Sequence, residues 1–280
     1  MTVVDAHQHV WDLDRVSYPW LTPDYGPLYR SFDERELAPQ LAAAGVDRTV
    51  LVQAADSEAD TNLMFEVADR WPTVAGIVGW VPLLAPEQAA DALEKRRQDA
   101  RFVGVRHLIH VEPDPDWLLQ PAVRDSLDVL AGLGLTFDVV AVLPRHLEHV
   151  STLAERHPNL RLVIDHLAKP SIKERGWQPW ADQIAHAAAY PNVYAKVSGL
   201  NTAADTPWAA EDLKPYVEQA ISAFGCGRLM FGGDWPIAIL NGDYAQVWSA
   251  TNSLLSGLSS AERDRILGGT AIDFYRLGIN

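Results

Sequence analysis

Apolar runs of strand length recur along the whole chain, and each is followed by turn residues and then by a stretch with the apolar spacing of a helix. Strands that alternate with helices of this length indicate a parallel sheet, and eight such units without a long polar linker predict closure into a (β/α)8 TIM barrel. The 280 residues suit one barrel of this kind, so we expect a single domain over residues 1–280. The eight predicted strands are Val3–His9, Arg48–Gln53, Val74–Val81, Phe102–Ile109, Thr136–Val142, Arg161–Leu167, Val193–Leu200 and Leu229–Trp235.

The segments between the strands contain helix boundaries and lack nucleotide-binding loops. Ser31 with Glu34 has the spacing of a capping box and predicts a helix that ends at Gly45. An open, doubly wound sheet is the main alternative to the barrel, but no predicted strand is followed by a Gly-x-Gly-x-x-Gly pattern or a phosphate loop. Gly232-Gly233 lies inside the last predicted strand, where we expect close backbone packing at a crowded barrel wall.

The composition is that of a globular protein, with 48% hydrophobic and 21% charged residues. The formal net charge of -14 opposes the approach of polyanions, so we expect neither nucleic acid nor an acidic membrane surface as a partner. No apolar stretch reaches the roughly 18 residues of a membrane span, and the first residues run into a strand pattern instead of a signal peptide, which predicts a cytoplasmic protein. Cys226 is the only cysteine, so no disulfide can form within the chain. Whether the chain forms a homo-oligomer stays open.

Histidines and a carboxylate end three of the predicted strands. In a barrel of this type the active site lies at the carboxyl ends of the strands, so these residues are the candidates for chemistry. His7 and His9 are two apart on the first strand, which directs both imidazoles to one face, together with Asp5. His166 ends the sixth strand and Asp234 ends the eighth. A lone histidine in an apolar strand is more often a core residue, but this set indicates one shared site.

Strand alternation also assigns faces on the fourth and sixth strands. We expect His166 to face inward with Ile164, and Asp165 to point toward the helices as a partner for a neighbouring side chain. Arg106 and His107 lie on opposite faces of the fourth strand. We favour Arg106 as a substrate or oxyanion contact, and the alternative is a salt bridge to a helix.

Further polar and aromatic residues are candidates for binding the substrate. Lys196 either enters the pocket or forms an ion pair with Asp165 or a similar neighbour. Indoles present a flat face to the C–H side of sugars and a donor to their hydroxyls, although the same residues can simply cover long loops. The loop Trp11–Tyr29 is long enough to act as a lid. Five of the ten tryptophans fall at or just after strand ends and are predicted to ring the mouth of the site: Trp11, Trp20, Trp80, Trp117 and Trp235.

Three motifs resemble those of the amidohydrolase superfamily, and specifically of its branch of lactone hydrolases. They are Val-Asp-x-His-x-His in the first strand, Asp165-His166-x-x-Lys169-Pro170 at the sixth and Phe231-Gly232-Gly233-Asp234-Trp235-Pro236 at the eighth. Within that branch, three further runs are most similar to sugar lactonases of the L-fuconolactonase and L-rhamnonolactonase type: Gly79-Trp80-Val81-Pro82-Leu83, Gly104-Val105-Arg106-His107 and Glu112–Leu118.

The resemblance implies a metal-dependent-hydrolase type of barrel in which His7 and His9 occupy metal-ligand positions and Asp234 occupies the general-base position. Many relatives carry a lysine or glutamate on the fourth strand and a histidine on the fifth. This chain has Arg106-His107 and the run 136–140 there, which argues against a binuclear site. Members of the lactonase branch also differ in whether they need a divalent ion.

We therefore predict hydrolysis of a sugar aldonolactone, which needs an activated water, a stabilised oxyanion and a proton for the leaving alkoxide. One divalent metal ion, with Zn²⁺ as first choice, would be held by His7, His9 and Asp234, with His166 as a further ligand. Catalysis without a metal stays open, and the imidazoles with Arg106 would then donate to the oxyanion. In both versions Asp234 accepts the proton and His166 assists. The expected substrate-binding residues are Arg106, His107, Lys196, Trp11, Trp20, Trp80 and Trp235.

Three alternatives remain beside the lactonase hypothesis, which expects a neutral sugar lactone. A metal-dependent decarboxylase of the same superfamily would use a similar site, with Arg106 holding the carboxylate of its substrate. A catalytically silent barrel that binds a sugar acid belongs to another class, and it predicts loss of the carboxylate that Asp234 retains. A hydrolase of C–N bonds is chemically close, but an unactivated amide needs more carbonyl polarisation than an ester.

Overall fold

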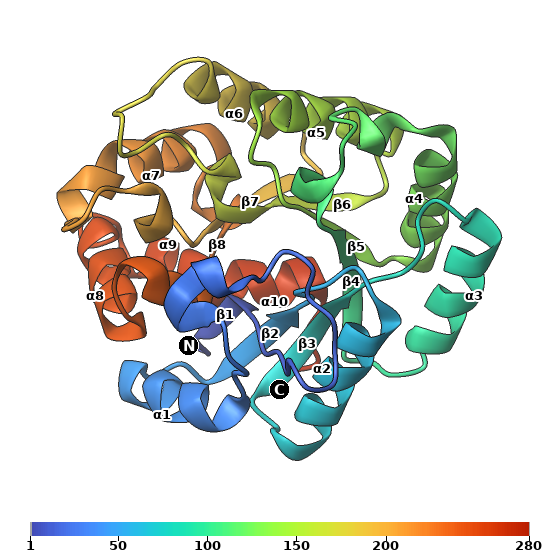
Figure 1. The fold of residues 1–280 in the computed structure, drawn as a ribbon. Coiled ribbons are helices and arrows are strands. Elements are labelled where there is room, and N and C mark those ends of the chain that lie inside the picture. Colours follow the sequence, from blue (N-terminus) through green and yellow to red (C-terminus); the bar gives the residue numbers. More distant parts are fainter. Residues whose placement is uncertain (1, 280) are drawn as a thin grey trace.

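The protein is described by a computed structural model, which covers residues 2–279. Eight parallel strands form one sheet in sequence order, and helices surround it (Figure 1). The TIM-barrel fold predicted from the alternation of strands and helices is confirmed, and the alternative of an open, doubly wound sheet is wrong. The strands are β1 Val4–Gln8, β2 Arg48–Val52, β3 Val74–Gly79, β4 Phe102–His107, β5 Thr136–Val139, β6 Arg161–Ile164, β7 Val193–Val197 and β8 Leu229–Phe231.

Each strand is shorter than predicted, and the difference lies at its carboxyl end. Seven strands begin at the predicted residue and β1 begins one residue later. Polar residues that the sequence assigned to the strand ends, such as His166 and Asp234, lie in the loops that follow. These side chains therefore follow loop geometry instead of strand alternation, and this matters for the site.

The outer helices begin and end at residues with recognisable capping roles. The side chain of Asp33 caps α1 by accepting a hydrogen bond from the amide of Arg35, so the predicted cap at Ser31 is wrong by two residues. Gly45 ends this helix with a φ of 70°, which a residue without a side chain adopts without strain. The main helices are α1 Glu34–Ala44, α2 Glu58–Arg70, α3 Pro86–Arg96, α4 Pro121–Leu133, α5 Pro144–Arg156, α6 Trp180–Ala188, α7 Ala210–Phe224, α8 Tyr244–Leu254, α9 Ser260–Asp264 and α10 Thr270–Tyr275.

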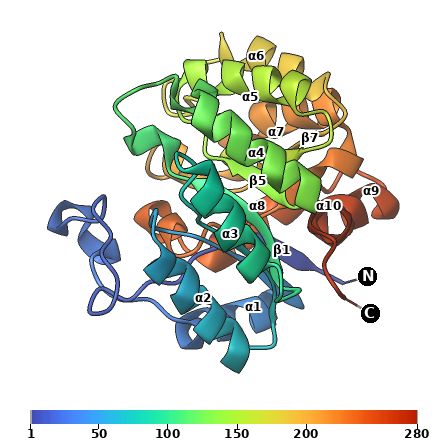
Figure 2. The ribbon, with the colours of Figure 1, turned by 90° about the vertical axis from the view of Figure 1, so that its right-hand side faces the viewer.

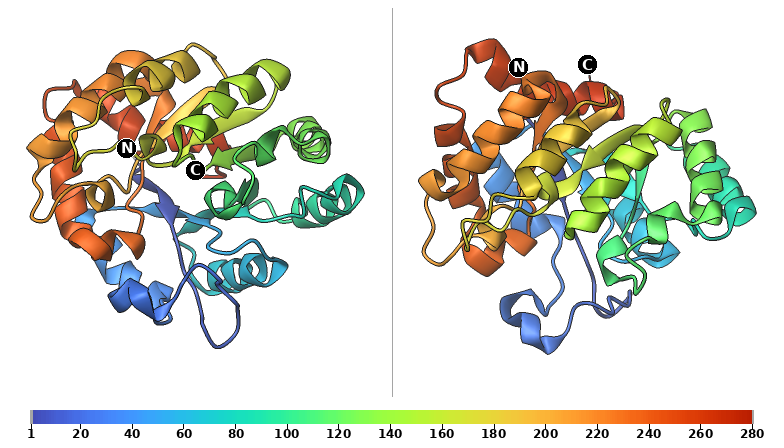
Figure 3. Two further views of the ribbon diagram at one scale, coloured as in Figure 1. Left: turned by 45° about the horizontal axis from the view of Figure 1, so that its top comes forward. Right: turned by 90° about the horizontal axis from the view of Figure 1, so that it is seen from above.

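The barrel closes where β8 returns beside β1. Gln8 and Trp235 form a parallel bridge there. The amide of His9 donates to the carbonyl of Trp235 at 2.8 Å, and the amide of Asp234 donates to the carbonyl of His7 at 2.8 Å. The closing seam therefore joins the two chain segments that carry the candidate site, and Figure 3 shows the resulting ring of strands and helices.

One end of the barrel is filled by apolar side chains and covered by α10. Valines from β1, β2, β3, β4 and β6 form a buried cluster with Phe274 and Tyr275 of α10. Both chain termini lie at this end (Figure 2). At the opposite side of that view, the long loop between β1 and α1 stands out from the barrel. None of the helices within residues 2–279 is long and apolar enough to cross a membrane.

Candidate active site

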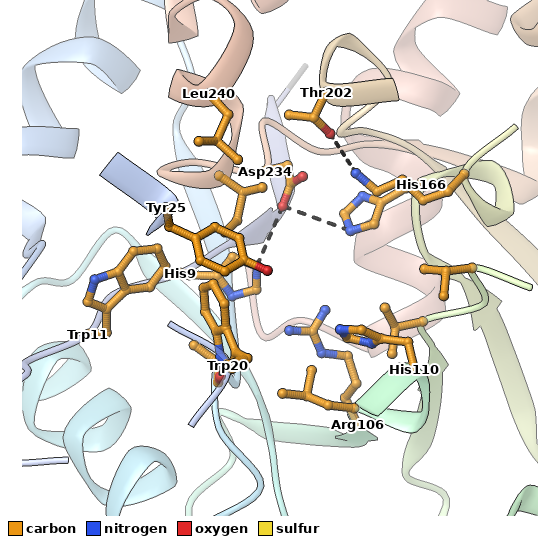
Figure 4. Close-up of a pocket in the computed structure, with 16 residues that line it drawn as sticks. His9, Trp11, Trp20, Tyr25, Arg106, His110, His166, Thr202, Asp234 and Leu240 are labelled. Carbon is orange, nitrogen blue, oxygen red and sulfur yellow. Dashed lines mark hydrogen bonds and ion pairs between the residues drawn. The ribbon is translucent and has the colours of Figure 1, made fainter. Parts of the chain in front are cut away.

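A pocket of about 310 Å³ opens at the carboxyl ends of the strands (Figure 4). Its deep part is polar and is formed by His9, Arg106, His166 and Asp234, each no more than 4% exposed. Its outer walls are mainly aromatic and aliphatic. They come from the β1–α1 loop and from the loops that follow the other strands: Trp11, Trp20, Tyr25, Leu108, Val140, Val142, Ile237 and Leu240.

Three imidazoles surround the carboxylate of Asp234 in the deep part. Nε2 of His9 lies 3.5 Å from Oδ1 of Asp234, and Nε2 of His7 and of His166 each lie 3.8 Å from the same oxygen. The two Nε2 atoms of His7 and His9 are 3.2 Å apart. The structure thus brings together the four residues that the sequence singled out, from the end of β1, the residue that follows it, and the loops after β6 and β8.

Asp5 does not join this cluster, although strand alternation predicted that it shares a face with His7. The pairing register of β1 shifts between Asp5 and Gln8, so the alternation is interrupted. The Asp5 carboxylate accepts hydrogen bonds from the hydroxyl of Tyr244 at 2.7 Å and from the amide of Gly233 at 2.8 Å. Asp5 therefore supports the backbone that precedes Asp234, and Gly233 leaves no room for a side chain beside it.

The predicted face of Asp165 is also wrong, whereas His166 points inward as predicted but does not share a face with Ile164. Ile164 packs in the cluster between sheet and helices, whereas Val163 lies in the barrel interior, so Asp165 continues the inward face. The strand ends at Ile164, and His166 has a φ of 55°, a left-handed conformation. This turn, and not strand alternation, directs His166 into the pocket, where its Nδ1 lies 2.8 Å from the hydroxyl oxygen of Ser198.

Asp165 belongs to a buried network of charges directly beneath the pocket. Its carboxylate lies 3.0 Å from Nη1 of Arg106 and 3.1 Å from Nζ of Lys196. Lys196 also contacts Asp138 at 2.5 Å, and its Nζ lies 3.0 Å from Nδ1 of His7. Lys196 is fully buried and does not line the pocket, so the alternative that it pairs with Asp165 is the one observed. The partner of Arg106 is Asp165 of the barrel interior, not a helix residue.

Several residues predicted to bind substrate lie outside the pocket lining. His107 stacks on Trp117 with ring centroids 3.9 Å apart and accepts a hydrogen bond from Nε1 of Trp80 at 3.1 Å. Trp235 is 2% exposed and packs edge-on against Phe32. His107, Trp80, Trp117 and Trp235 therefore pack within the loops behind the pocket wall. Of the predicted tryptophans, Trp11 and Trp20 do line the pocket.

The two pocket tryptophans cannot donate to a sugar, contrary to one expectation from the sequence. Nε1 of Trp11 donates to the carbonyl of Arg30 and Nε1 of Trp20 donates to the carbonyl of Ala54, each at 2.6 Å. Their indole N–H groups are therefore used within the protein. What they offer a ligand is their apolar surface.

The electrostatics of the cluster keep the carboxylate ionised and the imidazoles neutral. Burial alone would raise the pKa of Asp234, but the neighbouring His166, His9 and Lys169 outweigh burial and hold this pKa below its usual range. Burial lowers the pKa of His166 to about 4 and also lowers the pKa values of His7 and His9. A neutral imidazole beside an ionised carboxylate is the state in which both types of group bind metal ions.

The residues present can hold a metal ion. His7, His9 and Asp234 offer ligand atoms within 4.8 Å of one another, as do His7, Asp165 and His166. Neither carboxylate oxygen of Asp234 has a hydrogen-bond partner within residues 2–279, although both are buried. Unpartnered buried oxygens are rare, and a bound ion is one of the arrangements that satisfies them. Two imidazoles and a carboxylate with an open position match the donor set that Zn²⁺ takes in catalytic sites.

Sequence reasoning missed part of the pocket lining. Lys169 and Thr202 line it, and so do His110 and Tyr25. Lys169 was noted only as part of a motif, three residues after His166. Lys169 enters the pocket because of the left-handed turn at residues 166–169. Strand alternation in the sequence does not predict such a turn.

The closed parallel barrel carries three histidines and an unpartnered carboxylate at the carboxyl ends of its strands. These features place the protein in the class of barrels with a histidine–carboxylate centre. The chain belongs to the amidohydrolase family, whose model matches residues 4–277. The family resemblance predicted from the motifs is thereby confirmed.

Comparison with individual proteins supports the same assignment. The chain is 37% identical over 278 residues to L-fucono-1,5-lactonase of Burkholderia ambifaria, a match that covers 98% of this chain and 95% of that protein. A crystal structure of an amidohydrolase from Burkholderia multivorans with bound zinc superposes with a TM-score of 0.90 at 32% identity, covering 99% of this chain and 100% of that one. A 2,6-dihydroxybenzoate decarboxylase from Rhizobium superposes with a TM-score of 0.66 at 15% identity over 99% of each chain, which shows a shared fold alone.

Proposed function

We propose that this protein hydrolyses a neutral sugar lactone to the free aldonic acid. The observation that carries the proposal is the carboxylate of Asp234, which is buried at the base of the pocket, ionised and without a hydrogen-bond partner in the described chain. An ionised carboxylate with a free oxygen in the pocket has the protonation state that a general base requires. The 37% identity to an L-fucono-1,5-lactonase supports the lactone as substrate class.

The proposed reaction begins when Asp234 takes a proton from a water molecule that attacks the lactone carbonyl carbon. The new C–O bond leaves a negative charge on the former carbonyl oxygen. His166 and Arg106 line the same deep part of the pocket and would donate hydrogen bonds to that oxygen when no metal ion is bound. Nδ1 of His9 bonds the carbonyl of Val52 at 2.8 Å, so Nε2 of its neutral ring can only accept. The ring C–O bond then breaks, and Asp234 returns the proton to the ring oxygen. The products are a carboxylate and a hydroxyl group on one open chain.

The surrounding residues keep these groups in position. Arg106 is held by Asp165 and by the carbonyl of Gln53, so its guanidinium cannot turn away from the pocket. The contact with Ser198 fixes the ring of His166. Such preorganisation reduces the rearrangement that the transition state would otherwise require.

The metal-binding part of the proposal concerns His7, His9, Asp234 and His166, which would hold one divalent ion, with Zn²⁺ as first choice. A bound ion of this kind lowers the pKa of water and polarises a carbonyl group. The buried network of Lys196 and Asp165 beneath His7 would fix the orientation of that imidazole, because both contact its Nδ1 atom.

The proposal is tested with a panel of sugar aldonolactones, L-fucono-1,5-lactone included, in a pH-indicator assay with and without a chelator. We expect acid release from at least one lactone, and the chelator arm measures whether a metal is needed. Folded protein that is inactive on every lactone would contradict the proposal. Release of CO₂ from aromatic carboxylates would then favour the decarboxylase, and sugar-acid binding without turnover would favour the silent barrel.

The cytoplasmic location expected from the sequence is part of this proposal, and fractionation of the native cells tests it. The oligomeric state is open and can be measured by sedimentation.

A further inference from the structure

The backbone after β6 contains four consecutive left-handed residues. His166, Leu167, Ala168 and Lys169 have φ values between 48° and 61°, and none of them is glycine. Such a conformation is unfavourable for residues with a side chain and persists only where the surroundings hold it, typically at functional sites. Here Nε1 of Trp180 donates to the carbonyl of Leu167 at 2.6 Å, and the amide of Lys169 donates to the carbonyl of His166 at 2.9 Å.

The turn places its first and last side chains in the pocket. Leu167 and Ala168 are buried in the protein core, while His166 and Lys169 line the pocket. His166 belongs to the reaction centre already described. The unfavourable backbone therefore also positions Lys169, a residue to which the proposed reaction gives no role.

The ammonium group of Lys169 is anchored and keeps one free donor. It donates to the hydroxyl of Thr202 at 2.6 Å and to the carbonyl of Gly199 at 3.1 Å. The Thr202 hydroxyl donates in turn to the carbonyl of Gly199 at 2.8 Å. An ammonium group has three N–H donors, so one remains for a ligand.

Few other groups in the outer part of the pocket can bind a sugar hydroxyl. The indole donors of Trp11 and Trp20 are used by backbone carbonyls. The remaining walls are largely aliphatic, and Tyr25 and His110 lie at the exposed rim. Among the described residues that line the pocket outside the reaction centre, Lys169 is thus the anchored cationic donor.

Lys169 is half-buried, whereas the residues of the reaction centre are almost completely buried. It therefore lies nearer the mouth than Asp234, although its charge still lowers the pKa of that carboxylate. We propose that Lys169 is a specificity-determining residue that donates its free N–H to a hydroxyl oxygen of the sugar lactone. This inference rests on the proposed lactonase function and names the residue that selects hydroxylated lactones.

The test combines one substitution with a series of substrates. kcat and KM are measured for the wild type and Lys169→Met on the best lactone and on analogues that each lack one ring hydroxyl. We expect Lys169→Met to lower kcat/KM on the full lactone by about 10- to 100-fold, the effect of losing a charged hydrogen bond. On the analogue that lacks the recognised hydroxyl, the loss caused by Lys169→Met should be much smaller than on the full lactone.

Two further variants and a control separate recognition from folding. Lys169→Arg keeps the charge and should restore part of the loss. Thr202→Val frees the ammonium group and should give an intermediate loss on the full lactone. Lys173→Met is the matched control, because Lys173 lies on the same segment but is exposed and pairs with Asp205. It should leave all rates unchanged.

The outcomes distinguish the two proposals. If Lys169→Met lowers kcat/KM by the same factor on every analogue while the wild type is an active lactonase, the specificity role is overturned. If Lys169→Met does not fold, the same comparison with Thr202→Val and Lys169→Arg decides in the same way. A wild type inactive on every lactone overturns the proposed function itself, and this inference with it.

Discussion

At the scale of single residues, the feature that dominates this protein is a set of charged side chains with no access to solvent. Asp138, Asp165 and Lys196 are fully buried, and Arg106 is 3% exposed. Two carboxylates face two cations, so the charges balance. Burying each of these groups therefore costs less free energy than burying it without its partners. The network lies under the three imidazoles and contacts His7 directly.

Lys196→Met should therefore be strongly destabilising. It leaves the carboxylates of Asp138 and Asp165 facing each other with a single cation nearby, and loss of one partner from a buried pair costs about 3–5 kcal/mol. Urea unfolding monitored by tryptophan fluorescence measures the free energy of unfolding. Lys214→Met is the control, since Lys214 forms an exposed pair with Glu218 and its loss should change little. Equal stability of both variants would contradict the role given to the network.

The residue scale also shows what the sequence could predict of the site. His7, His9, Asp234 and Arg106 were identifiable because each is a polar residue at a predicted strand end. Asp165 was assigned to the wrong face, because the face of its strand was set by an inward His166, and a left-handed turn directs His166 into the pocket. Lys169 was not assigned a role at all, since neither strand nor helix periodicity describes four left-handed residues.

At the scale of elements, the β1–α1 loop forms one wall of the pocket and is held to the barrel by a buried hydrogen bond. The hydroxyl of Tyr18 donates to Oδ1 of Asp60 in α2 at 2.8 Å. The Asp60 carboxylate also accepts from the amides of Ala54 and Ala55. Trp11 and Trp20 of this loop line the pocket, so its attachment at Tyr18 fixes the aromatic wall.

Tyr18→Phe should destabilise the protein in a pH-dependent manner. Burial raises the pKa of Asp60 to about 6, above its ordinary value of 3.8. A group of this kind contributes stability that is full below its unfolded pKa and is lost as the pH rises through its folded pKa. Removing a donor from the ionised carboxylate therefore costs more at pH 8 than at pH 5, with about 1–3 kcal/mol expected at the higher pH.

The measurement for Tyr18→Phe is urea unfolding at the two pH values. Tyr25→Phe serves as control, because Tyr25 lies on the same loop but is 38% exposed, and its stability should match the wild type at both pH values. The same loss of stability for Tyr18→Phe at pH 5 and pH 8 would contradict the ionisation of Asp60 between these two pH values.

At the scale of the whole molecule, the first and the last strand of the barrel together form the reaction centre. The seam between β1 and β8 is formed by His7, His9, Asp234 and Trp235 through their backbone groups. The same residues supply most of the reaction centre, so the site exists only when the barrel is closed. The fold class could be predicted from the alternation of strands and helices, whereas the closing contacts depend on residues more than 200 positions apart and leave no local pattern.

A single domain over residues 1–280, which stays a prediction, implies one cooperative unfolding transition. Tryptophan fluorescence, far-ultraviolet circular dichroism and enzymatic activity should change together with increasing urea, because loss of the seam removes both the site and the barrel. Two separated transitions, or activity lost well before the fold, would contradict this expectation.

The most direct test of the account is the turnover of Asp234→Asn, which keeps the size of the side chain and removes its ability to accept a proton. We predict an unchanged circular dichroism spectrum and a rate on the best lactone that is lower by about 10²- to 10⁴-fold. Asp205→Asn, a change at an exposed carboxylate, should retain the full rate. A folded Asp234→Asn protein that hydrolyses the lactone at a near-normal rate would remove Asp234 from the reaction and contradict the central claim.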